Sequence, residues 1–275
     1  MGKPLKEWDI QINYGIKTGF NEAFIIDGST KDTLIAEDPK SVEIIRPILR
    51  GKDIKKYKAE FADLYLIYAP WHFPLHNDTT IQGASLKAEQ AFREDFPAIY
   101  QHLSKYKRQL SARNKAETGI RYEWYALQRW GANYWEEFEK EKIIFQEIVQ
   151  EPCFILDEED KYFCLDTARV ITGENLKYLL CVFNSNLFFY AVKQFYGGGG
   201  LGATGVRMKH TFFENFSLPK LSAVENNTWI NLANQILESK QMNTPTLLIE
   251  NEINRLVYDI YGLTEKEIEL IVKSI

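Results

Sequence analysis

A glycine-rich stretch at 194–210, QFYGGGGLGATGVRMKH, has the residue spacing most suggestive of chemistry in this chain of 275 residues. It contains FxGxG, a pattern of S-adenosylmethionine sites, and GxGxxG, a pattern of dinucleotide sites. Such glycines bind phosphate when a strand leads into them and a helix follows, because the free N–H groups of the helix then face the anion. Here a helical pattern precedes the glycines and an extended pattern follows them. The order disfavours a cofactor site and leaves a loop that could approach a phosphate or serve as a hinge.

Other spacings typical of catalysis have little support. His72 and His76 are four residues apart, as zinc ligands on one helix would be, but Pro74 between them interrupts a helix. The ExK triplet at 159–161 falls in an expected turn, and the chain lacks the Pro-Pro dipeptide with which DNA-methylating enzymes hold an extruded base. The three cysteines form no CxxC and are interpreted as buried apolar residues. The sequence thus contains no catalytic motif and predicts no metal or cofactor in this chain.

Basic and aromatic side chains alternate in RYEWYALQRW, at 121–130. Arginine beside flat rings can clamp a phosphate or bind guanine through two hydrogen bonds. The net charge of the chain is -5, yet 101–130 has seven Lys and Arg against two Glu, and 50–58 has five against one Asp. Acidic residues concentrate at 136–160. Two oppositely charged faces are expected if the basic stretches converge, and ordinary solvated helix surfaces are an equally good interpretation.

The elements that would position these residues mix runs of strands with runs of helices, which indicates an α+β fold. Apolar periodicity, caps and turn residues define them. Strands are expected at 8–14, 23–26 and 63–70, with turns at 15–19 and 27–28. Further strands are expected at 142–150, 153–157 and 161–172, with a hairpin at 158–160, and an extended segment at 208–219. Helices are expected at 41–46, 86–92, 99–110, 176–196 (interrupted at 184–186), 229–238 and 247–261, and from Thr264, with a capping box to Glu267.

Eight segments, taken in order, resemble the TaqI-like C-terminal specificity domain, which is the target recognition domain of Type IIG restriction-modification enzymes and adenine-specific DNA methyltransferases. They are GIKTGFNEAFIID (15–27), ILRGKDIKKY (48–57), FPAIYQHLSKYKRQLSAR (96–113), YEWYALQR (122–129), KIIFQEI (142–148), LKYLLCVFNSNLFFY (176–190), GGGGLGATGVRMKHTFFENFSLPKL (197–221) and ENEINRLVYDIYGLTEKEIELI (250–271). The resemblance implies a mixed or antiparallel sheet with packed helices, a DNA target recognition domain at 1–221 and a helical tail at 222–275. Asn254 stands where the family commonly has Asp, a difference expected to bear on helix packing.

The resemblance also implies a function, which is sequence-specific recognition of double-stranded DNA for methylation or cleavage by other domains of the same enzyme. S-adenosylmethionine and Mg²⁺ are expected only in those domains, a methyltransferase and in some members a nuclease. No apolar run could span a membrane, and we expect a cytoplasmic protein. Two alternatives remain open. The chain could be a methyltransferase or endonuclease by itself, or a specificity subunit that mainly docks a partner protein through 136–160 or the tail.

Transferred position by position, the resemblance puts DNA contacts on four stretches, at 17–21, 50–56, 121–129 and 198–210. We expect the lysines to hold phosphates. Arg129, Arg207 and Asn21 are candidates for base edges, since arginine suits guanine and asparagine suits adenine. The expected contact residues are Lys17, Thr18, Asn21, Arg50, Lys52, Lys56, Arg121, Trp124, Arg129, Gly198, Gly200, Arg207, Lys209 and His210.

Overall fold

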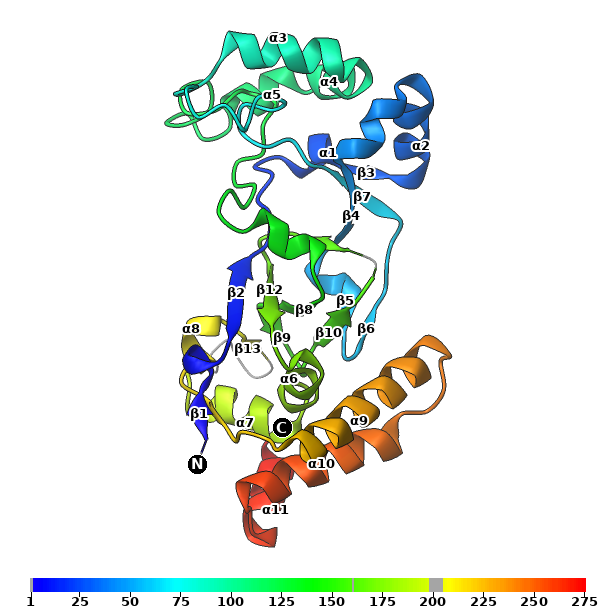
Figure 1. Cartoon of the computed structure of the whole chain (residues 1–275), viewed down its shortest axis with the longest axis vertical. Helices are drawn as coiled ribbons and strands as arrows, with labels where there is room; N and C mark the ends of the chain where they lie inside the picture. Colours follow the sequence, from blue (N-terminus) through cyan, green and yellow to red (C-terminus); the bar gives the residue numbers. More distant parts are fainter. Residues whose placement is uncertain (1, 160, 198–204) are drawn as a thin grey trace.

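An antiparallel sheet of four strands lies at the centre of the computed structural model, which describes residues 2–159, 161–197 and 205–275 (Figure 1). The strands are mostly apolar, and Ile143, Phe145 and Val170 are fully buried, as in a sheet covered on both faces. In spatial order the strands are β10 (Phe154–Asp157), β8 (Lys142–Gln146), β12 (Ala168–Gly173) and β2 (Ile10–Tyr14).

A second, mixed sheet contains β11 (Phe163–Cys164), β4 (Ile45–Leu49), β7 (Leu64–Ile67) and β3 (Ile25–Asp27), in that order. Strand β11 pairs in parallel with β4, so the hairpin predicted at 158–160 is wrong. The Asp157 carboxylate pairs with the buried Lys142 at 2.6 Å and accepts the N–H groups of Lys161 and Tyr162 at 3.1 and 2.7 Å. These contacts turn the chain away from β10. Three short pairs complete the strands: β1 (Lys3–Pro4) with β14 (Ser217–Leu218), β5 (Ile54–Lys55) with β6 (Lys58–Ala59), and β9 (Ile148–Val149) with β13 (Val206–Arg207).

Five helices gather at the upper end of the molecule in Figure 1: α1 (Asn21–Phe24), α2 (Gly28–Glu37), α3 (Leu86–Asp95), α4 (Pro97–Ser104) and α5 (Lys107–Ala112). Two predictions are wrong here. The strand expected at 23–26 begins as the one-turn helix α1, and the expected turn at Asp27 is the start of α2, because the Asp27 carboxylate accepts the Thr30 N–H at 2.7 Å. The helix expected at 99–110 is divided between α4 and α5. Short 3-10 helices cover Leu5–Glu7, Pro39–Ile44, Gly51–Asp53 and Trp135–Glu139.

Helices α6 (Leu176–Phe183) and α7 (Asn186–Gln194) lie below the central sheet and confirm the predicted interruption. The Ser185 hydroxyl accepts the Phe188 N–H at 3.2 Å and caps α7. The three cysteines are buried, as predicted. The segment expected to be extended at 208–219 instead forms the short helix α8 (His210–Phe213) before β14. Its Phe213 ring packs edge-on against Phe188 at 5.3 Å, which shows that tertiary packing decides this segment.

The C-terminal helices α9 (Ala223–Gln241), α10 (Leu247–Tyr261) and α11 (Glu265–Ser274) pack beneath α6 and α7. The capping box between Thr264 and Glu267 is present as predicted. Trp229 and Val257 of this tail are buried in the same core as the sheets. The α+β fold with a C-terminal helical segment is therefore confirmed, whereas the domain division at 221 stays a prediction. Within the described ranges, the search for a helix long and apolar enough to cross a bilayer gives none.

Candidate nucleic-acid interface

Tyr14, at the end of β2, is the centre of a group of basic side chains from distant segments. Arg169 lies opposite Tyr14 in the register of β2 and β12, and its guanidinium carbon is 4.1 Å from the ring centroid. Arg129 approaches the same ring at 5.2 Å, and His210 meets it edge-on at 5.6 Å. Such contacts between cations and rings are attractive and orient the guanidinium planes. We call this group, together with the acid that pairs with it, the Tyr14 cluster: Tyr14, Arg129, Glu147, Arg169, Arg207 and His210.

The backbone around Tyr14 brings two of the predicted stretches together. Lys17 and Arg129 exchange two backbone hydrogen bonds, both 2.9 Å long, so their side chains leave the chain as neighbours. Gly15 lets the same segment lie close to the backbone of Leu165, because a Cβ atom there would lie 2.1 Å from the Leu165 carbonyl oxygen. The Arg129 guanidinium then lies 3.8 Å from the Asp166 carboxylate. Lys17 and Arg129, predicted from two separate stretches, thus lie next to each other.

Arg113 is a buried guanidinium that ties these stretches to one another. It donates to the backbone carbonyls of Thr18 and Ala126, and to those of Leu110 and Trp124 at 3.2 and 3.0 Å. Burial lowers its pKa to about 10. Arg113 therefore contributes nothing to the surface charge expected for 101–130, and instead holds the loops that carry Lys17 and Arg129.

A hollow of about 440 Å³ adjoins Lys17 and Arg129 and is also lined by Trp71, Trp130 and Tyr134. Arg121 lies over the Trp71 ring at 5.4 Å and pairs with Glu117 at 2.8 Å. Two predicted contacts, Lys17 and Arg129, therefore line one hollow with aromatic walls, and Arg121 contacts two of its lining residues, Trp71 and Glu117.

Arg207 joins the Tyr14 cluster from β13. Its Nε lies 4.0 Å from the Glu147 carboxylate, which also pairs with Arg169. Within the described part of the chain, the shielded Nε atoms of Arg169 and Arg207 and the Nδ1 atom of His210 lack a hydrogen-bond partner. Burial lowers the pKa of His210, and the Arg169 charge lowers it further, so the ring is largely neutral at pH 7. Unpaired shielded polar atoms are uncommon in folded proteins, and three of them lie together in this cluster.

Arg50 and Lys52 follow strand β4. The Leu49 carbonyl accepts the Leu165 N–H at 3.3 Å, which brings the next residue, Arg50, toward Asp166. Arg50 is held by two hydrogen bonds of 2.8 Å to Asp53, and Lys52 is exposed. Lys209 is half-buried, with its amine 5.7 Å from the Phe212 ring.

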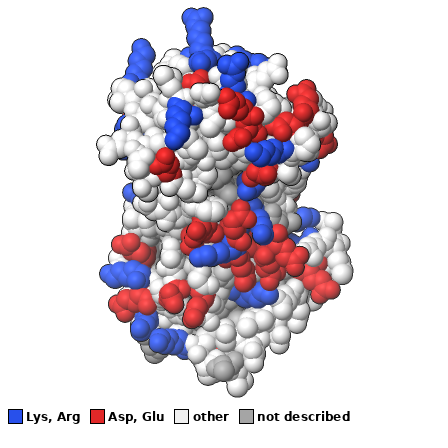
Figure 2. Space-filling view, turned by 45° about the horizontal axis from the view of Figure 1, so that its top comes forward, with Lys and Arg blue, Asp and Glu red and all other residues white. Residues whose placement is uncertain are grey.

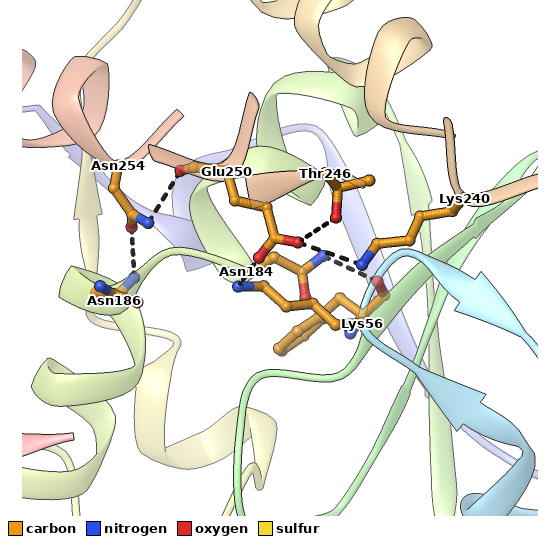
Figure 3. Close-up of polar contacts among 8 residues, drawn as sticks. Lys56, Asn184, Asn186, Lys240, Thr246, Glu250 and Asn254 are labelled. Carbon is orange, nitrogen blue, oxygen red and sulfur yellow. Dashed lines mark hydrogen bonds and ion pairs between the residues drawn. The ribbon is translucent and has the colours of Figure 1, made fainter. Parts of the chain in front are cut away.

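The remaining predicted contacts have other surroundings. Thr18 is buried and donates to the exposed Asn21 at 2.6 Å, and Trp124 is buried with its indole N–H on Glu89 at 2.7 Å. The Lys56 side chain is only 17% exposed. Its amine pairs at 2.8 Å with the carboxylate of Glu250, which belongs to α10 of the C-terminal tail (Figure 3). Thr18, Lys56 and Trp124 thus serve the fold. Gly198 and Gly200 lie outside the described residues.

Sequence reasoning missed Tyr14, Glu147 and Arg169. One signal was available, because Arg169 is a charged residue in the otherwise apolar ARVIT segment of a strand expected to be buried. Its meaning depends on the pairing of β2 with β12, which no local pattern specifies.

Charged side chains are unevenly distributed on the face of the molecule that Figure 2 shows. Figure 2 shows Lys and Arg side chains scattered over the upper end, and Asp and Glu side chains gathered across the middle of the same face. Phosphates would be repelled from the acidic area, which favours another face for a duplex. In the described ranges, a search for groups of three or more His, Cys, Asp or Glu side chains that could hold a metal finds none.

Comparison with known proteins identifies the family. The TaqI-like C-terminal specificity domain matches residues 46–200, more than half of the chain, and the chain therefore belongs to this family, as the sequence predicted. The fold is similar to that of the Type IIL restriction-modification enzyme MmeI, solved in complex with DNA, with 13% identity and a TM-score of 0.64 over 99% of this chain and 36% of MmeI. It also matches the Type IIG restriction endonuclease BpuSI, with 12% identity and a TM-score of 0.46 over 93% of this chain and 31% of BpuSI. No curated protein matches the chain.

The match to MmeI concerns the fold and only part of the length of that enzyme. At 13% identity the match to MmeI shows the fold, an α+β domain. The chain spans about a third of the length of the two enzymes.

Proposed function

We propose that the chain is a sequence-specific recognition module for double-stranded DNA, which directs methylation or cleavage carried out by other domains of a restriction-modification enzyme. S-adenosylmethionine and Mg²⁺ would be bound by those other domains. Family membership supports this proposal, as does the fold shared with an enzyme solved in complex with DNA. The alternatives, catalysis by this chain alone and a mainly protein-docking role, lack a comparable supporting observation.

The observation that carries the proposal is the state of two arginines in the Tyr14 cluster. The side chains of Arg129 and Arg207 are 44% and 42% exposed, and their nearest acids lie at 3.8 and 4.0 Å. At these distances the carboxylates orient the guanidinium groups without forming hydrogen bonds to them. Each arginine can therefore still donate two parallel hydrogen bonds to a ligand. These two residues would bind guanine edges in the major groove.

The neighbouring side chains would position the duplex. Lys17, Lys52 and Lys209 would contact phosphates, together with Arg50 and Arg121, and Asn21 is the candidate for adenine. His210 would approach the same surface beside Tyr14. The glycines at 198 and 200 stay predicted phosphate contacts.

Selection from a randomised pool of duplexes tests the function. We expect the full chain to enrich one motif, and to bind generic duplex with micromolar or weaker affinity that falls steeply as salt rises, because counterions are released from DNA on binding. A pool of single strands is the matched control and should give no common motif. Absence of both enrichment and salt-sensitive binding would contradict the proposal.

Turnover assays test the assignment of chemistry to other domains. Incubation of the chain with the selected duplex and either Mg²⁺ or S-adenosylmethionine should give neither cleavage nor methylation. Clear turnover would instead support the catalytic alternative.

A further inference from the structure

Glu147 lies between β8 and β9 and meets two guanidinium groups from different strands. Its carboxylate pairs with Arg169 of β12 and approaches Nε of Arg207 of β13 at 4.0 Å. Its backbone is also fixed, since its N–H donates to Thr167 at 3.0 Å and its carbonyl accepts the Met208 N–H at 2.6 Å. The position of the carboxylate is thus set by three segments of the chain.

The two arginines near Glu147 differ in their exposure and in the number of hydrogen bonds that they form within the protein. The Arg169 side chain is 5% exposed, stacks on Tyr14 and donates through Nη1 to the carbonyls of Asp166 and Ala168, both at 2.9 Å. The Arg207 side chain is 42% exposed, and its two terminal nitrogens have no hydrogen bond among the residues that the structure describes. Arg169 is therefore a structural cation, and Arg207 presents its outer edge to a ligand.

The Glu147 carboxylate should affect which ligand binds to the outer edge of Arg207. A phosphate carries a negative charge, and Glu147 behind Arg207 would repel it, whereas the O6 and N7 acceptors of guanine are uncharged. The attraction between the Glu147 carboxylate and Nε, 4.0 Å apart, favours orientations of the guanidinium that turn its outer edge away from Glu147, and that edge can make a bidentate contact. Specificity of this kind depends on an unfavourable term for the wrong ligand as well as a favourable one for the right ligand.

We propose that Glu147 is a specificity-determining residue of the DNA site, which positions Arg207 for a guanine edge and disfavours a phosphate at the same place. The inference rests on the proposed function and deepens it. Glu147 acts through Arg207 and is a positioning residue, with no contact of its own to DNA required.

The test compares motifs selected from a randomised duplex pool by four proteins: the wild type, Glu147→Gln, Arg207→Lys and the control Glu151→Gln. Glu147→Gln removes the charge and keeps the shape. Glu151 is exposed and forms no ion pair or hydrogen bond within the described ranges, so Glu151→Gln matches the charge change alone. Thermal unfolding of each variant shows whether it is folded.

We expect the wild type and Glu151→Gln to enrich the same motif. Glu147→Gln should lose preference at one G·C pair by roughly tenfold, while its binding to a scrambled duplex stays equal or tightens. Arg207→Lys should lose preference at the same pair, because lysine keeps the charge but lacks the planar fork. If Glu147→Gln is unstable, the Arg207→Lys arm still decides whether this arginine reads a base.

Two results would overturn the inference. One is an unchanged preference at every base pair in Glu147→Gln, and the other is an unchanged preference in Arg207→Lys. Failure of the wild type to enrich any motif is a different result, because it rejects the proposed function and this inference with it.

Discussion

The junction with the helical tail and the Tyr14 cluster both contain basic residues that the sequence predicts to bind DNA, but their partners differ. In the tail junction, Glu250 accepts from Lys56 at 2.8 Å, Lys240 at 3.2 Å and Thr246 at 2.7 Å (Figure 3). In the Tyr14 cluster, three shielded nitrogen atoms have no partner among the described residues. Polar groups that all have partners within the protein stabilise the fold. Polar groups without such partners can still form hydrogen bonds to a ligand.

Asn254 is a further polar residue of the tail junction. Its side-chain oxygen accepts the Asn186 N–H at 2.8 Å at the start of α7, and its amide donates to the Glu250 carbonyl at 3.0 Å (Figure 3). An asparagine can do both, because its amide both donates and accepts. Asn254 therefore links α10 to the start of α7, and its difference from the family stays a prediction.

The largest effect is expected for Arg113, which holds the loops that carry Lys17 and Arg129. Arg113→Met removes the donors to four buried carbonyls and should lower the free energy of unfolding by about 3 kcal/mol, measured by urea denaturation. The neighbouring Arg108 is exposed, and Arg108→Met should change it by less than about 0.5 kcal/mol. Equal stability of Arg113→Met and wild type would contradict the positioning role.

The next effect concerns DNA affinity. Arg129→Ala should weaken binding to the selected duplex by about tenfold to a hundredfold, since a base-contacting arginine contributes roughly 1–3 kcal/mol. Its backbone bonds to Lys17 remain, so the unfolding temperature should not change. Arg255→Ala is the control, because Arg255 is an exposed arginine paired with Glu252 and Asp259 on α10. A similar loss of affinity in both variants would remove the distinction between the two regions.

The tail junction should respond to pH. Burial alone would raise the pKa of Glu250, but hydrogen bonds from Lys56 and Thr246 outweigh burial and lower it. The carboxylate therefore stabilises the folded state above its ordinary pKa, and this contribution is lost as the pH falls through the lowered value. Glu250→Gln should cost about 1–2 kcal/mol of unfolding free energy at pH 7.

Denaturation at a series of pH values checks this prediction. The difference between wild type and Glu250→Gln should shrink in acid, and DNA affinity should be unaffected at pH 7. Glu252→Gln, on an exposed pair of the same helix, serves as the control. A constant difference at all pH values would show that the Glu250 charge is not what stabilises the junction.

The smallest effect is expected for a phosphate contact. Lys52→Ala should make the negative slope of log K against log salt less steep by about 0.9 and weaken binding equally for all duplex sequences. The exposed Lys266 of α11 lies in the tail, and Lys266→Ala should leave the slope unchanged. Loss of preference for one base pair in Lys52→Ala would mean that Lys52 contacts a base edge.

Local signals in the sequence predicted the elements better than their partners. The break at Ser185, the limits of α10 and the cap at Thr264 follow from helix periodicity and capping residues nearby. Pairing of β11 with β4, of Tyr14 with Arg169 and of Lys56 with Glu250 joins residues far apart in the chain. Such contacts depend on the whole fold, so the sequence could not indicate that Lys56 pairs with the tail or that Glu147 lies between Arg169 and Arg207.

The central claim is that the Tyr14 cluster reads DNA and the tail junction does not. The most direct measurement is the ratio of Kd for a scrambled duplex to Kd for the selected duplex, determined for the Arg129→Ala/Arg207→Ala double variant and for Lys56→Met. We predict that the double variant loses about a hundredfold of this ratio and that Lys56→Met keeps it. Equal ratios in the two variants, with both folded, would contradict the account.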